Sequence, residues 1–433
     1  MGRKQVRVGR RAFLANTAAA GAGVALAGGV PAFLRSARAQ QATVRIFMVP
    51  EHKFKTYDAL FAQFAKDKNV RVEPEYLQYP ELRAKMLATA AGGDAPDVIW
   101  DFNWTQEMAK LGLLQSFTDY LKRDGAAIGF PSDWLQSAID RQVYNNNLYG
   151  LQNFFTNECL FYNKKLLRDA GVQQPPTTWD EFLDAATKTT KHTGGTDVWG
   201  FVSVYRFLNG FLTWYFQGGA RLYDPQANKM LTDSPDALAA FQFFHDLHWK
   251  YKVAPVPVVE AGVANPRKMF TSGRVAMIIS GPWDLAPIRQ EAGPDFEWGV
   301  SMPLKGKVRA TLQAGTGVNI PKNAPNKDLG WELIKRILSL DTMRSLTKEA
   351  DFLFARRSWA SLPEVQNSPV LKVFSQARAY AVDWNAGLRL TGKGDIQTTM
   401  FQTLVDQVTF NLKPVPDAVG EFTAKANAEL RQG

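Results

Sequence analysis

The 433-residue chain contains a single cysteine, Cys159. One thiol cannot form an internal disulfide, and it cannot supply a metal site built from several cysteines. Its neighbours Leu160 and Phe161 are apolar, which favours a buried strand thiol over a nucleophile. Cysteine chemistry is therefore not expected in this protein.

Histidine and catalytic motifs are also scarce. Of four histidines, only His245 and His248 lie close together in the sequence, and a structural pair is favoured over a shared metal. No G-x-S-x-G nucleophile motif occurs. Residues 387–394 (GLRLTGKG) come within one residue of a phosphate-binding loop, but Gly394 stands where Ser or Thr must bind magnesium. We interpret that match as chance and expect neither a metal nor a cofactor.

Excess positive charge is confined to the N-terminal end. Seven of the 51 Lys and Arg residues lie within residues 1–39, which contain no acid. The remaining 44 basic and 41 acidic residues are scattered and give a net charge of +3, so no nucleic-acid partner is expected. About 394 residues remain after residue 39, a length that suggests two lobes rather than one core.

Residues 1–39 have the pattern of an export signal. A basic start precedes an Ala/Gly-rich run and the small-residue cleavage site ARA, which ends at Ala39. The segment GRRAFL at residues 9–14 resembles a twin-arginine signal, and an ordinary secretory signal is the alternative. Pro31 and Arg35 argue against a membrane span. With no cysteine near the cleavage site to carry lipid, the mature chain is expected to be free in the periplasm.

Strand and helix patterns alternate along the mature chain. Residues 43–49, 70–76 and 96–100 read as strands, and amphipathic helices follow the first two. This order predicts a parallel sheet covered by helices. Ser234-Pro235 begins another helix, residues 275–279 form an apolar strand, and the tail from residue 395 is helical with a break near Pro414.

The most informative block covers residues 149–182. Two strand-like runs precede a short helix that ends at Gly171, and Pro175 and Pro176 then forbid helix. Thr178 and Glu181 form a T-x-x-E capping box, which predicts that a new helix begins there.

This block resembles one shared by extracellular solute-binding proteins of the maltose-binding type, which feed ABC importers. The similarity lies in YGL at residues 149–151 and FYNKKLLRDAGVQQPPTTWDEF at residues 161–182. FTSGRVAMIISGPW (270–283) and APNKDLGWELIKRIL (324–338) resemble two later blocks of the same family. The resemblance therefore covers nearly all of the mature chain.

The resemblance implies an α/β fold of two lobes, of the type II periplasmic binding protein kind. Each lobe would be a mostly parallel sheet flanked by helices, with three crossings between lobes near residues 156–159, 301–305 and 317–322. Residues 40–157 and 303–320 would form the N-terminal lobe, and residues 158–302 and 321–433 the C-terminal lobe. A solute would lie in the cleft between them, beyond the strand ends, and hinge closure would bury it.

A carbohydrate site needs aromatic platforms and a few polar groups. Candidates matching family positions follow the first and third strands, lie in the first crossing, or belong to the NGFLTW, GPWD and ARRS segments. Large aromatics can equally be core residues. The candidates are Glu51, His52, Asp101, Asn103, Trp104, Glu158, Phe211, Trp283, Asp284, Arg356 and Arg357.

The expected function is therefore non-enzymatic binding of a sugar or oligosaccharide by a monomer that delivers it to an ABC permease with a separate ATPase. If Arg356 and Arg357 both faced the solute, an anionic sugar or a phosphorylated polyol would be favoured. An exported carbohydrate-cleaving enzyme, which needs only two suitably spaced carboxylates, is the rival from another class. The identity, length and charge of the solute stay open.

Overall fold

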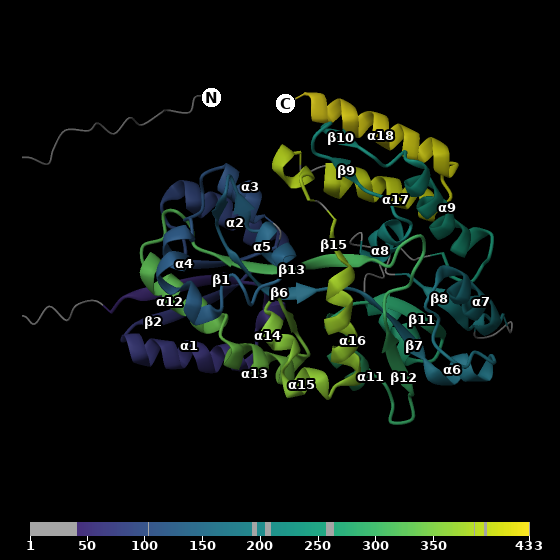
Figure 1. The fold of residues 1–433 in the computed structure, drawn as a ribbon, viewed down its shortest axis with the longest axis horizontal. Helices are drawn as coiled ribbons and strands as arrows, with labels where there is room; N and C mark the ends of the chain where they lie inside the picture. Colours follow the sequence, from purple (N-terminus) through teal and green to yellow (C-terminus); the bar gives the residue numbers. More distant parts are fainter. Residues whose placement is uncertain are drawn as a thin grey trace, which may run out of the picture. The chain divides into compact units, whose positions relative to one another are not determined.

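The computed structural model describes residues 41–102, 104–192, 197–203, 209–256, 264–384, 386–393 and 396–432. The expected signal segment 1–39 and the candidate Asn103 lie outside these described residues. Residues 41–433 form one compact unit built around two larger sheets (Figure 1).

The first sheet has strand order β14-β6-β13-β3-β1-β2, with β15 paired to β13. Its strands are β1 (Thr43–Met48), β2 (Arg71–Tyr76), β3 (Val98–Asp101), β6 (Leu151–Thr156), β13 (Thr311–Asn319), β14 (Leu353–Phe354) and β15 (Ala381–Asp383). Strand β1 is parallel to β2 and β3, whereas β13 is antiparallel to β3 and β6. The strands expected from residues 43–100 are confirmed.

Both faces of the first sheet are buried. Along β1, Val44 and Ile46 point into the same core as Trp331, whereas Phe47 points into a separate core with Leu82. This alternation follows from the two-residue period of a strand. One face is covered by α1 (Lys55–Lys68), α12 (Lys327–Ile337) and α13 (Leu340–Ala350), and the other by α2 (Tyr79–Gly92) and α3 (Thr105–Lys110).

The second sheet has strand order β12-β7-β11-β8. Its strands are β7 (Cys159–Asn163), β8 (Trp199–Val202), β11 (Val275–Ser280) and β12 (Trp298–Ser301). Helices α7 (Trp179–Thr189), α8 (Asn209–Gln217), α9 (Pro235–Trp249), α17 (Phe401–Thr409) and α18 (Val415–Arg431) share one core, and the last three of these contact one another (Figure 1). Residues of α10 (Ala264–Thr271), α11 (Leu285–Glu291) and α16 (Pro369–Ala377) pack with Val275 and Ile278 of β11.

The remaining elements are short connections between these layers. They are α4 (Thr118–Asp124), α5 (Gln136–Asp140), α6 (Lys164–Asp169), α14 (Arg357–Ala360), α15 (Pro363–Gln366), the hairpins β4–β5 (Val143–Tyr144, Asn147–Leu148) and β9–β10 (Tyr223–Asp224, Lys229–Met230), the 3-10 turns η1 (Pro50–His52), η2 (Gly125–Ile128), η3 (Pro282–Asp284), η4 (Arg378–Tyr380) and η5 (Leu388–Thr391), and the π-turn η6 (Ile396–Met400).

The expectation of mostly parallel sheets needs correction, because both sheets are mixed. Parallel pairing holds for β1 with β2 and β3, for β8 with β11 and for β13 with β15. Antiparallel neighbours enter where an extended segment leaves one sheet and continues into the other, as β6 does into β7 and β12 does into β13. Each lobe therefore combines a βαβ part with returning strands.

Two crossings fall near their expected places, and the third does not. The chain passes from β6 to β7 at residues 157–158, and from β12 to β13 between Ser301 and Thr311. After β13 it stays on the first sheet, where Arg336 of α12 lies 2.7 Å from Asp67 of α1. It leaves this side through α16, which contacts β14, β7 and β12. The assignment of all of 321–433 to the C-terminal lobe is therefore wrong, since the amphipathic pattern of α12 does not reveal which core it joins.

The local signals at helix ends are confirmed. Thr178 and Glu181 make the reciprocal capping box at the start of α7, and Ser234 caps α9. Gly171, with a φ of 76°, follows α6 in the left-handed region that glycine tolerates. Cys159 is buried, as expected. Among the helices that the structure describes, none combines the length and apolarity needed to cross a membrane.

Candidate functional site

Two neighbouring parallel strands of the first sheet deliver the first group of candidates. Strand β1 continues into η1, which carries Glu51 and His52, and β3 ends at Asp101 just before α3. Because β1 pairs in parallel with β3, these residues follow adjacent strand ends, as the sequence predicts. Glu51 is exposed, whereas His52 and Asp101 are buried.

His52 lies within an aromatic cluster. Its ring centroid is 4.7 Å from that of Phe154, 5.8 Å from Phe352 and 6.0 Å from the stacked ring of Phe102. Burial lowers the pKa of His52 to about 3, so the imidazole is neutral at physiological pH. Its buried Nδ1 atom has no hydrogen-bond partner among the described residues. His52 therefore carries one unpartnered polar atom within a buried aromatic cluster.

Asp101 is already held at the start of α3. Its carboxylate accepts the backbone N–H of Trp104 and lies 2.5 Å from the hydroxyl of Thr105. Burial raises the pKa of the Asp101 carboxyl. Thr105 also lies within hydrogen-bond distance of Gln142 and of Asn319 on β13. Asp101 therefore belongs to a polar network, and the buried Trp104 packs with residues of α2 rather than forming an open platform.

Glu158 occupies the first crossing. It is 2% exposed, and Thr213 of α8 donates a hydrogen bond to its carboxyl group. Its backbone N–H donates to Thr311 Oγ1 at 2.8 Å, and Thr311 donates back to the Glu158 carbonyl at 2.7 Å. Burial raises the pKa of Glu158 to about 8. These bonds tie the first crossing to α8 and to the first residue of β13.

Trp283 and Asp284 lie in η3, directly after β11 of the second sheet. Asp284 is buried, accepting from the Ser280 hydroxyl at 2.5 Å and from Arg267 Nη1 at 2.8 Å. Trp283 is half-buried, and its indole N–H has no hydrogen-bond partner among the described residues. The Trp283 ring covers Gly281, where an added Cβ would lie 2.1 Å from ring atom Cζ3. Asp284 thus supports the local structure, and Trp283 stays available for contact.

Two candidates from the sequence, Phe211 and Arg356, have structural surroundings that argue against solute contact. Phe211 is in the second core, stacked on Phe241 with ring centroids 4.5 Å apart. Arg356 is buried, and its Nε donates to Asp133 Oδ2 at 2.6 Å while Nη1 donates to the Leu338 carbonyl. Arg357 is exposed. Resemblance to family positions predicted solute contact for Phe211 and Arg356, but tertiary neighbours occupy both side chains.

The structure adds a polar cluster that sequence reasoning missed. Arg141, which follows α5, has Nη1 2.7 Å from Asp383 Oδ1 on β15, and Arg389 of η5 also donates to the Asp383 carboxylate. Both arginines are at most 4% exposed. Arg389 lies within the GLRLTGKG segment, but no local pattern marked it, because its partner is assembled by the fold.

Segments from both cores meet at this cluster. Leu388 of η5 belongs to the second core, and β15 pairs with the start of β13 from the first sheet. Helix α3 contacts η5, with Lys110 Nζ donating to the Leu390 carbonyl at 2.8 Å. The cluster therefore lies at the junction between the two lobes.

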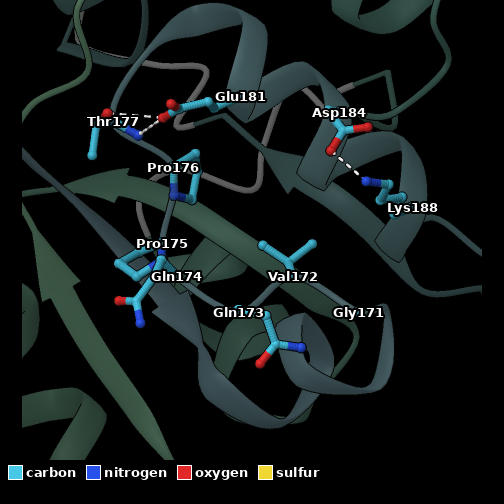
Figure 2. A pocket seen from close by; sticks show the side chains of 10 residues that line it. All are labelled: Gly171, Val172, Gln173, Gln174, Pro175, Pro176, Thr177, Glu181, Asp184 and Lys188. Carbon is cyan, nitrogen blue, oxygen red and sulfur yellow. Dashed lines mark hydrogen bonds and ion pairs between the residues drawn. The ribbon is translucent and has the colours of Figure 1, made fainter.

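A separate groove lies at the surface beside α7 (Figure 2). Its lining residues are Gly171, Val172, Gln173, Gln174, Pro175, Pro176, Thr177, Glu181, Asp184 and Lys188. Figure 2 shows Glu181 bonded to Thr177 and Asp184 paired with Lys188. The charged side chains of the groove therefore stabilise the start and the exposed face of α7. None of the residues predicted for the site lines this groove.

A family model for bacterial extracellular solute-binding proteins matches residues 50–342. The maltotriose-binding protein of Pyrococcus abyssi is 25% identical over 320 residues, which cover 72% of this chain and 66% of that relative, just under two thirds of its length. The galactooligosaccharide-binding protein of Bacillus subtilis is 22% identical over 336 residues, covering 74% of each chain.

Solved structures support the same fold. The GacH receptor of Streptomyces glaucescens, solved unliganded and with acarbose, is 25% identical with a TM-score of 0.78, covering 90% of this chain and 98% of the receptor. The sugar-binding protein MalE of Xanthomonas citri is 24% identical with a TM-score of 0.80 and the same coverage. The two-lobe α/β fold class is thus confirmed. Because the family model spans well over half of its length, the chain belongs to the bacterial extracellular solute-binding protein family.

Proposed function

We propose that this protein is the periplasmic solute-binding component of an ABC importer. It binds a carbohydrate between its two lobes and delivers it to membrane permease subunits driven by a separate ATPase. Family membership supports this role, and the named specificities of relatives for maltotriose and galactooligosaccharide support a sugar as the solute.

The observation that carries the proposal is that a ring with an unpartnered nitrogen follows a strand end in each of the two sheets. His52 follows β1 of the first sheet, and Trp283 follows β11 of the second. Each combines an aromatic ring with a nitrogen that has no partner among the described residues. A sugar has apolar C–H faces and hydroxyl edges, which match such groups. In this proposal, His52 and Trp283 belong to opposite walls of the cleft. Glu51, Asp101 and the Arg141–Asp383–Arg389 cluster line the same cleft.

The proposal extends to export and lobe organisation. Residues 1–39 would be a twin-arginine signal cleaved near Ala39, which releases a monomer into the periplasm. The N-terminal lobe would comprise residues 40–157 and 303–320, extended by the segment that carries α12 and α13. Residues 158–302 and the tail with α17 and α18 would form the C-terminal lobe.

No covalent chemistry is proposed. Asp101 and Asp284, which could be read as a hydrolase pair, are both buried and hydrogen-bonded to neighbouring groups. We therefore expect the mature protein to gain thermal stability with one class of intact saccharide, since a solute at ~100 times its Kd adds ~2.7 kcal/mol to the unfolding free energy. Chromatography of the same mixtures tests the rival function, because released monosaccharide would contradict the proposal.

Replacing Trp283 with Ala tests the wall of the cleft that we assign to the second sheet. We expect solute affinity to fall at least tenfold, because the half-buried indole would lose its stacking contact. The matched control is Trp249→Ala on α9, an exposed tryptophan whose indole N–H donates to the Thr409 carbonyl. Calorimetric titration of both variants decides the matter, and equal affinities would remove Trp283 from the site.

A further inference from the structure

The Arg141–Asp383–Arg389 cluster contains more hydrogen-bond donors than its own residues can satisfy. The single carboxylate of Asp383 pairs with two buried guanidinium groups. Arg141 Nη2 and Arg389 Nε and Nη1 are buried and have no partner among the described residues. Leaving a buried donor unpaired is unfavourable, and more so when the donor is charged. An ion pair that only held the lobes together would need one arginine.

Gln313 adds an uncharged amide to the same place. Its residue is fully buried, and neither Oε1 nor Nε2 has a partner in the part of the chain that the structure describes. The parallel pairing of β13 with β15 sets Gln313 beside Asp383, so both side chains leave the sheet on the same face. Arg141 Nη1 also donates to the Gln313 carbonyl at 3.3 Å. Three residues from separate segments thus direct unpaired polar atoms into one region.

The charges around the cluster favour a monoanion as its partner. Two guanidinium groups face the single carboxylate of Asp383. Asp101 interacts electrostatically with Arg141, and Lys110 lies nearby, donating to a backbone carbonyl. Three basic groups against two acidic groups leave one surplus positive charge. A singly charged anion would balance this charge, whereas a phosphate dianion would exceed it.

We infer that the Arg141–Asp383–Arg389 cluster and Gln313 recognise the carboxylate of an acidic sugar. Guanidinium groups bind carboxylates through two directed N–H bonds, and a neighbouring amide can pair with an adjacent sugar hydroxyl. The solute class would then be a uronic acid or an oligosaccharide that contains one. This inference rests on the proposed function and names the substrate class of the same site.

Access to the cluster is compatible with this assignment. The Asp383 side chain is 17% exposed, so the cluster reaches solvent at one edge. Arg356, which together with Arg357 suggested an anionic solute from the sequence, is bonded to Asp133 instead.

Calorimetric titration of the mature protein at pH 7.5 tests the inference with D-galacturonate, digalacturonate, D-galactose, galactobiose and glucose 6-phosphate. We expect at least one uronate to bind at least tenfold more tightly than its neutral counterpart and than the phosphate ester. Arg389→Met should remove this preference. Arg168→Met on α6, an exposed arginine paired with Glu297, is the matched control and should keep it.

Gln313→Leu provides a second variant in case Arg389→Met fails to fold. It removes amide atoms that make no hydrogen bond among the described residues, so folding should be retained while uronate affinity falls. Binding of neutral sugars alone, or tighter binding of the phosphate ester, would overturn the carboxylate assignment and leave the proposed function standing. Binding of no saccharide would overturn both.

Discussion

At the scale of single residues, Glu158 links the crossing between the lobes to protonation. Burial raises its pKa from 4.5 to about 8, so the folded protein holds this proton over a range in which the unfolded chain has lost it. The folded state therefore binds more protons between these pKa values, and its stability must fall as pH rises through this interval. The stabilisation that the Glu158 proton gives the folded state is complete below about pH 4.5 and lost above about pH 8.

Glu158→Gln should remove this dependence while keeping a polar group of similar size near Thr213. We expect the two proteins to have similar unfolding free energies at pH 5, and the Gln variant to be more stable at pH 8.5 by at least about 1.4 kcal/mol, the value of one pKa unit. Urea unfolding at both pH values measures the difference. If the two proteins differed in unfolding free energy by the same amount at both pH values, a buried, protonated Glu158 would be contradicted.

The sequence predicted where single residues lie better than what they contact. Glu158 does lie in the first crossing, and His52 and Asp101 do follow strand ends. The partner of Arg356, however, is Asp133, 223 residues earlier, and Arg141 meets Asp383 across 242 residues. No local pattern encodes such pairs, so it could neither exclude Arg356 nor find Arg141.

At the scale of elements, helix ends were the most predictable feature. The capping box of α7 depends on a few adjacent residues, so its chemistry is fully present in the sequence. Placement of a whole helix is different. The apolar face of α12, with Trp331 and Ile334, fits any apolar surface of matching size, and only the fold assigns it to the first core.

Thr178→Ala tests the capping box. The Thr178 hydroxyl accepts the Glu181 N–H at 3.2 Å, so its removal should lower the unfolding free energy by about 1 kcal/mol. Solute affinity should not change, because none of the proposed site residues lies at this helix start. Thr187→Ala, an exposed position in the last turn of α7, should cost nothing since alanine favours helix. Denaturant unfolding compares the two, and equal losses would argue against a capping role.

At the scale of the whole molecule, two cores are joined by two extended crossings, from β6 to β7 and from β12 to β13, and by a third passage through α16. The crossings bring β13, β15 and η5 together, so polar groups from distant segments meet at the junction of the lobes. Such an arrangement suits a protein that shifts between open and closed populations when a solute contacts both lobes. The central claim is that this shift captures an intact carbohydrate.

Native mass spectrometry of the mature protein tests that claim most directly. The protein would be mixed with neutral and acidic oligosaccharides, and the mass of each complex and of each free sugar would be measured. We predict one saccharide per chain, with the bound and free sugars intact. Absence of any adduct, or the appearance of cleaved sugars, would contradict a carbohydrate-binding role without catalysis.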